Sequence, residues 1–138
     1  MLKEPSSLSF LNQLQQIITR LAENSSKIKN WCISIISGLI ALAVTKNNYE
    51  IACVSFIPIL LFHILDSYYL SLENDFRDIY NDFVKDPKEE YLFVIKVPSK
   101  FCHRVPSIIK NMFCSFSTLP FYGISYFFVI VTIILGTK

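Results

Sequence analysis

The chain has 138 residues, of which 52% are hydrophobic and 17% are charged, and its formal net charge is +2. In soluble domains about a quarter of the residues are charged, so this lower charged fraction favours a small membrane protein. The small net charge gives no reason to expect a nucleic-acid partner. The cysteines form no CxxC pair and no secretory signal peptide precedes the first apolar run, so neither a zinc site nor a disulfide framework is predicted.

The segment 1–30 is predicted to be a cytoplasmic amphipathic helix that continues into the first membrane span. Its stripe of seam positions repeats at intervals of three and four residues, as in a coiled coil, and consists of Leu11, Leu14, Ile18, Leu21, Ser25 and Ile28. Ser6 and Ser7 are suitable N-cap residues. We therefore expect a long helix over about residues 7–45.

Three apolar runs, 28–45, 51–69 and 119–136, are each long enough to cross a bilayer. Only a few polar residues separate the first two runs, so these should form an antiparallel transmembrane hairpin at 28–69. The predicted fold class is therefore an all-α membrane protein. It combines this hairpin and its cytoplasmic helical extensions with a third transmembrane helix at 119–136.

The segment 70–118 is predicted to be cytoplasmic and to contain amphipathic helices. A second heptad-like seam, which can pack on the first, consists of Leu65, Tyr69, Leu72, Phe76, Ile79 and Phe83. We expect this helix to span about 50–85, because Asp86 precedes a proline. The run 91–97 is expected to be extended, as a short strand or as a segment at the interface. Apolar residues at helical spacing over 105–117 predict an interfacial amphipathic helix.

Basic residues predict the orientation of the chain. Of the 13 Lys and Arg residues, all but Lys46 and Lys138 lie before or at the start of the first span, or between the second and third spans. The positive-inside rule then places the N-terminus in the cytoplasm and the C-terminus outside. The predicted membrane-interface anchors are Trp31, Lys27, Lys29, Tyr68 and Tyr69.

Two ionisable residues, His63 and Asp66, lie within or at the edge of the second span and are candidates for a pore or gate. The structural alternative for Asp66 is pairing with the neighbouring helix, where Lys27, Lys29 and Asn30 lie at the same level. His63 can bond to Ser34 or Ser37 of the first span, or face the lumen of an oligomer.

On the cytoplasmic helix, Glu73 and Arg77 are spaced for an i,i+4 ion pair. Together with Tyr80 they are candidates for contact with a partner or a signal, although a solvated helix face carries such charges without any partner. The chain has no GxGxxG, GxxxxGK[ST], GxSxG or HExxH motif, and it has only two histidines. We therefore predict no enzyme activity, no catalytic or metal site and no cofactor.

Two strings carry a resemblance to a known family. They are Q-x-I-x-x-R-L-A-x-N-S-x-x-x-K-x-W at 15–31 and L-D-S-Y-Y-L-x-x-E-x-x-F-R-x-x-Y at 65–80. They resemble small bacterial inner-membrane proteins of unassigned function, and the hairpin over 15–85 is similar to SLATT-type transmembrane effectors. The third span and 91–97 fit that pattern less well.

The resemblance implies an effector of anti-phage defence that forms a homo-oligomer in the bacterial inner membrane. Such a protein permeabilises or depolarises the bilayer when a sensor protein or a nucleotide second messenger acts on its cytoplasmic part. The alternative is a non-catalytic accessory subunit that anchors a larger complex. A phage holin fits less well, because three-span holins usually have the opposite orientation and short loops.

Overall fold

The computed structural model describes residues 5–86 and 101–136, which form helices joined by short turns and contain no strand. Three helical stretches are long and apolar enough to cross a membrane: Pro5–Lys46, Glu50–Lys85 and Thr118–Gly136. The predicted all-α class and its three apolar helices are therefore confirmed. The segment 91–97, expected to be extended, lies outside the described residues.

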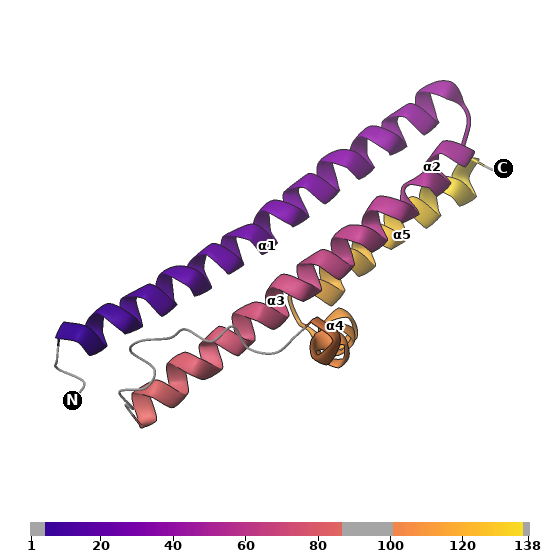
Figure 1. Cartoon of the computed structure of the whole chain (residues 1–138). Helices are drawn as coiled ribbons and strands as arrows, with labels where there is room; N and C mark the ends of the chain where they lie inside the picture. The colour runs from indigo at the N-terminus through magenta and orange to yellow at the C-terminus, as the bar shows by residue number, and fades with distance from the viewer. Residues whose placement is uncertain (1–4, 87–100, 137–138) are drawn as a thin grey trace.

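Helix α1 (Pro5–Lys46) runs without interruption along the whole molecule (Figure 1). It ends in a Schellman motif, in which the amides of Asn47 and Asn48 donate to the carbonyls of Val44 (3.2 Å) and Ala43 (3.1 Å). Asn47 has a φ of 49°, a left-handed conformation that asparagine tolerates better than most residues. This motif reverses the chain within three residues, so the next helices return alongside α1.

The returning segment consists of α2 (Glu50–Val54) and α3 (Phe56–Lys85), which are divided at Ser55. Pro58 has no amide hydrogen, and it lies in the first turn of α3, where no intrahelical partner is required. The expected single helix over 50–85 is thus two helices on nearly one line. Its C-terminal end, at Lys85, agrees with the sequence prediction.

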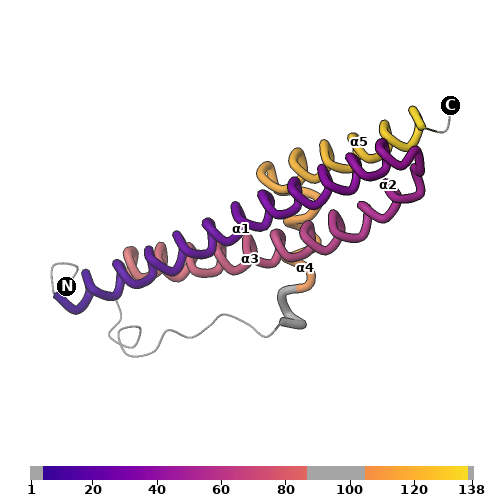
Figure 2. Tube along the Cα trace, turned by 90° about the horizontal axis from the view of Figure 1, so that it is seen from above, coloured from indigo at the N-terminus to yellow at the C-terminus, as the bar shows by residue number. Residues whose placement is uncertain are grey.

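Helices α4 (Phe101–Cys114) and α5 (Thr118–Gly136) complete the described chain. Figure 1 shows α4 nearly end-on, so it crosses the long helices, and it packs on α3. Helix α5 lies beside α2 and the first half of α3 and also touches α1 (Figure 2). The C-terminal end of α5 therefore lies near the α1–α2 turn, far from the start of α1.

These contacts divide the molecule into two regions with separate cores. The three-helix region comprises residues 28–46, 50–66 and 118–136, where α2 and the first part of α3 together count as one helical stretch, and the two-helix region comprises 5–27 and 67–85. The core of the three-helix region contains Cys32, Ile36, Ile59, Tyr122 and Val129. The core of the two-helix region contains Phe10, Leu14, Phe76 and Phe83. The two predicted heptad seams supply most of this second core.

Candidate functional site

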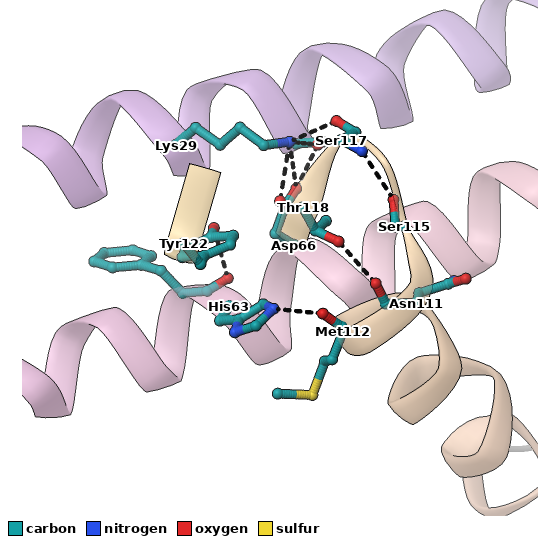
Figure 3. Close-up of polar contacts among 11 residues, drawn as sticks. Lys29, His63, Asp66, Asn111, Met112, Ser115, Ser117, Thr118 and Tyr122 are labelled. Carbon is teal, nitrogen blue, oxygen red and sulfur yellow. Dashed lines mark hydrogen bonds and ion pairs between the residues drawn. The ribbon is translucent and has the colours of Figure 1, made fainter. Parts of the chain in front are cut away.

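A buried ion pair lies where the two regions meet. Lys29 Nζ on α1 is 2.9 Å from Asp66 Oδ2 and 3.2 Å from Asp66 Oδ1 on α3 (Figure 3). The Asp66 side chain is 0% exposed, whereas the Lys29 side chain is 17% exposed. The predicted pairing of Asp66 with the neighbouring helix is therefore confirmed, with Lys29 as the partner.

Two serines extend this pair into a network that joins three segments of the chain. Ser25 donates a hydrogen bond to Asp66 Oδ1, and Lys29 Nζ donates to Ser25 Oγ over 3.0 Å. Lys29 Nζ also lies 3.4 Å from Ser117 Oγ, in the turn before α5. A buried carboxylate is costly unless it is paired with a cation and hydrogen-bonded. Lys29 supplies the cation, and the hydrogen bonds from Ser25 and Lys29 both go to Asp66 Oδ1, while Oδ2 has the ion-pair contact alone within the described residues. We call Ser25, Lys29, Asp66 and Ser117 the junction cluster.

His63 lies one turn along α3 from Asp66, on the side of the three-helix region, and it is buried. Its Nε2 is 3.2 Å from the Met112 carbonyl oxygen, so Nε2 must carry the hydrogen of this bond. Its ring stacks on Tyr122, with 4.4 Å between ring centroids and 15° between planes. The prediction that His63 bonds Ser34 or Ser37 is wrong: its partners come from α4 and α5, and Ser34 donates to the Asn30 carbonyl instead.

The corner between α4 and α5 is fixed by local hydrogen bonds. Thr118 Oγ1 donates to the Asn111 carbonyl over 2.7 Å, and the Ser117 amide donates to Ser115 Oγ over 3.2 Å. Farther along the same α3–α4 interface, Ser71 donates to Ser107 over 3.1 Å. Tyr122, in the second turn of α5, donates to the Phe62 carbonyl over 3.1 Å. These bonds hold the start of α5 against both the junction cluster and His63.

The remaining predicted residues lie apart from the junction cluster. Arg77 Nη2 is 2.6 Å from Glu73 Oε1, which confirms the predicted ion pair, and Tyr80 packs at the edge of the two-helix core. Among the predicted interface anchors, Trp31 and Lys27 are exposed, and the partly buried rings of Tyr68 and Tyr69 meet edge to face. Lys29 is held by Asp66 instead of lying free at the surface.

The sequence predicted Asp66, His63 and Lys29 as residues of interest, but it did not predict that Ser25, Ser117 and Tyr122 belong to the same site. Ser25 carried a usable signal, because it is the one polar residue at a seam position otherwise filled by leucine and isoleucine. Ser117 and Tyr122 come from the far end of the chain, and no local pattern links them to Asp66. Their contribution depends on how α4 returns α5 to the hairpin.

Among residues 5–86 and 101–136, no group of three His, Cys, Asp or Glu side chains is placed to hold a metal ion. Comparison with known proteins gives no relative: no family model, no curated protein and no solved structure matches the chain. The resemblance to SLATT-type effectors therefore stays a prediction from the two sequence strings.

Proposed function

We propose that the chain is a multi-pass protein of the bacterial inner membrane, with its N-terminus in the cytoplasm and its C-terminus outside. The distribution of basic residues supports this orientation. In it, the three-helix region forms a transmembrane hairpin with a third span, and the two-helix region is a cytoplasmic extension. The junction cluster then lies near the cytoplasmic edge of the bilayer, where a lysine and an aspartate remain close to water.

We also propose that the protein is an effector that oligomerises and permeabilises or depolarises the membrane in response to a cytoplasmic signal. The observation that carries this proposal is the buried Lys29–Asp66 pair at the boundary of the two regions. Ionisable side chains within or at the edge of a membrane span commonly mark ion pathways or gates. The resemblance to SLATT-type effectors supports a role in anti-phage defence.

In the proposed resting state both candidate pore residues, His63 and Asp66, are bonded to side chains or backbone of their own chain. Asp66 is paired with Lys29, and His63 is stacked on Tyr122 and bonded to α4. A signal acting on the two-helix region or on α4 would reach these residues directly, because α3 runs from the two-helix region through Asp66 and His63, and α4 packs on α3. Separation of Lys29 from Asp66 would expose both charged groups to a lumen between several copies.

This mechanism is tested by comparing wild type with Asp66→Asn in an inducible bacterial host. Membrane potential and propidium iodide entry are followed together, at matched amounts of membrane-inserted protein. Asp78→Asn is the control, since Asp78 is an exposed carboxylate on the same helix. We expect Asp66→Asn to depolarise cells at a lower inducer dose than wild type, because it weakens the contact that holds the resting state. Asp78→Asn should match wild type.

Intact potential in all three strains, at high expression and with the cytoplasmic trigger present, would contradict the effector proposal. The second candidate would then be preferred, a non-catalytic subunit that anchors a larger complex. It is supported by the exposed pair Asp78 and Asp82 on α3 and by Phe116, which is 96% exposed beside α4. Affinity capture of the intact protein in mild detergent separates the two: an anchor brings a stoichiometric partner, whereas an effector brings further copies of itself.

A further inference from the structure

Helix α4 packs on α3 mainly through polar side chains. Ser107 and Asn111 lie one turn apart on α4, with Ile108 buried beside them, and Ser107 accepts the hydrogen bond from Ser71 of α3. Ser67 lies one turn from Ser71 on the same face of α3. Within the described residues, the Ser67 hydroxyl oxygen and the Asn111 side-chain nitrogen are buried without a hydrogen-bond partner. Burial of such groups costs free energy, so α4 does not bury the face that water would favour.

The more apolar face of α4 points away from the protein. Val105, Ile109 and Phe113 follow one another at intervals of four residues, and all three are exposed. Phe116, in the turn after α4, extends this row and is 96% exposed. In water an amphipathic helix packs its apolar face inward. The reversed arrangement of α4 indicates that its outer face is not in contact with water.

The exposed apolar surface continues from α4 over the three-helix region. Leu119 follows Phe116 at the start of α5, and Leu42, Leu61 and Phe127 are exposed on α1, α3 and α5. A surface that binds a protein partner is commonly a limited apolar patch with a polar rim. Exposed apolar side chains on each of these helices fit the hydrocarbon of a bilayer instead, because lipid tails are as apolar as leucine.

We propose that α4 lies in the cytoplasmic leaflet of the bilayer, with its apolar face among the acyl chains, and that this leaflet thereby stabilises the resting position of His63. The proposal rests on the proposed membrane placement and effector function. The bonds of α4 to α3 involve His63 and Ser71, on either side of Asp66, so α4 lies at the level that this placement assigns to the cytoplasmic edge. It crosses the long helices (Figure 1), as a helix in the plane of the bilayer does.

The link between the leaflet and His63 is the backbone of α4. The Met112 carbonyl accepts the hydrogen bond from His63 Nε2 over 3.2 Å (Figure 3), and Phe113 follows Met112 directly. Because Phe113 and this acceptor are adjacent in one helix, withdrawal of α4 from the leaflet would carry the acceptor away from His63. Loss of lipid contact would therefore favour opening of the proposed gate.

The depth of α4 is measured with one tryptophan per chain. Trp31→Phe removes the natural tryptophan, and Phe113→Trp, Phe127→Trp or Leu8→Trp is then introduced. The replaced side chains are 66%, 62% and 51% exposed, so each position lies mainly at the surface. Phe127 is the control in the proposed third span, and Leu8 is the control in the proposed cytoplasmic extension.

The full chain is reconstituted in vesicles of phosphatidylglycerol and phosphatidylcholine. The phosphatidylcholine is an equal mixture of molecules brominated near the start and near the end of one acyl chain, so bromine quenches tryptophan from within the lipid. Iodide on both sides of the membrane quenches from water. We expect brominated lipid to roughly halve the fluorescence of Phe113→Trp and Phe127→Trp, because the apolar face of an interfacial helix lies about 5–10 Å below the headgroup boundary. Leu8→Trp should be quenched by iodide alone.

Three other outcomes are decisive. Bromine quenching of Phe127→Trp, with Phe113→Trp quenched by iodide alone, would overturn the inference and leave the membrane placement intact. Shielding of Phe113→Trp from both quenchers would assign the outer face of α4 to a protein surface, such as a second copy, and would also overturn it. Absence of bromine quenching at both positions would instead contradict the placement.

The link to His63 is tested by membrane depolarisation in the inducible bacterial host. Phe113→Asn weakens the contact of α4 with lipid, and we expect it to depolarise cells at a lower inducer dose than wild type, as Asp66→Asn does. Leu8→Asn, at an exposed position far from α4, should match wild type. A wild-type dose for Phe113→Asn beside a lowered dose for Asp66→Asn would overturn the link to His63. Intact potential in every strain would contradict the effector proposal itself.

Discussion

The two regions of the molecule are held together by different chemistry. The two-helix region has a core of large apolar side chains, with the rings of Phe10 and Phe83 4.8 Å apart. The three-helix region also has apolar contacts, but His63 and Tyr122 stack inside it, and the junction cluster closes its inner end. The same two helices, α1 and α3, thus take part in both kinds of interface.

This difference in the contacts between helices agrees with the solvent proposed for each region, which is water for the two-helix region and lipid for the three-helix region. In water, burial of apolar surface drives two helices together, and a heptad seam is sufficient. In lipid, the surroundings are as apolar as leucine, so helices associate through close packing and polar contacts. The outward-facing residues agree with this division: Leu42, Leu61 and Phe127 are exposed in the three-helix region, whereas Asp78, Asp82 and Arg20 are exposed in the two-helix region.

The largest loss of folding stability is expected for Lys29→Met, which removes the cation of the junction cluster. Asp66 would remain buried without its cation, and loss of one partner of a buried pair costs about 3–5 kcal/mol. Thermal unfolding of the protein in detergent, followed by circular dichroism, measures the change. Lys27→Met is the control, because Lys27 is exposed. Equal melting temperatures for the two variants would show that Asp66 does not depend on Lys29.

Phe83→Ala tests the apolar core of the two-helix region. Phe83 is buried against Phe10, and truncation of a core phenylalanine costs about 3–5 kcal/mol, with the lower end expected near the open end of a two-helix pair. We expect faster protease cleavage within 67–85 of the reconstituted protein, because this region unfolds locally while the three-helix region stays intact. Val84→Ala, at an exposed neighbour, should leave the cleavage rate unchanged. Joint unfolding of both regions would contradict their separation.

Sequence patterns located the C-terminal ends of the two long helices well, because these boundaries depend on local chemistry, whereas the helix predicted over 105–117 is α4 at Phe101–Cys114. The polar stretch 46–50 and the Asp86 boundary predicted the ends of α1 and α3 closely. The division at Ser55 was missed, since transmembrane helices commonly tolerate a proline such as Pro58. Here the helix is interrupted just before the proline instead of passing through it.

The site was only partly predictable, for a reason of geometry. Asp66 and Lys29 lie on adjacent helices of one hairpin, so counting residues from the turn brings them to the same level. Ser117 and Tyr122 reach this level through the α4–α5 corner, whose shape depends on contacts such as Thr118 with Asn111. No spacing in the sequence encodes where that corner lies against α3. The partners of His63 could not be predicted for the same reason.

The smallest loss of folding stability is expected for Arg77→Gln, which breaks the ion pair with Glu73 but keeps most of the side-chain stem. Arg77 is 59% exposed, so its guanidinium stays hydrated without Glu73, unlike the lysine at the junction cluster. An i,i+4 pair of this kind contributes about 0.3–0.5 kcal/mol, and salt should reduce even that. Thermal unfolding at low and high salt, with Lys29→Met measured in parallel, gives the loss of stability and its dependence on salt. A loss as large as that of Lys29→Met would mean that Glu73, which is also largely buried, needs its partner as Asp66 does. The two regions would then depend equally on buried charge, and their difference would lie in the apolar seam alone.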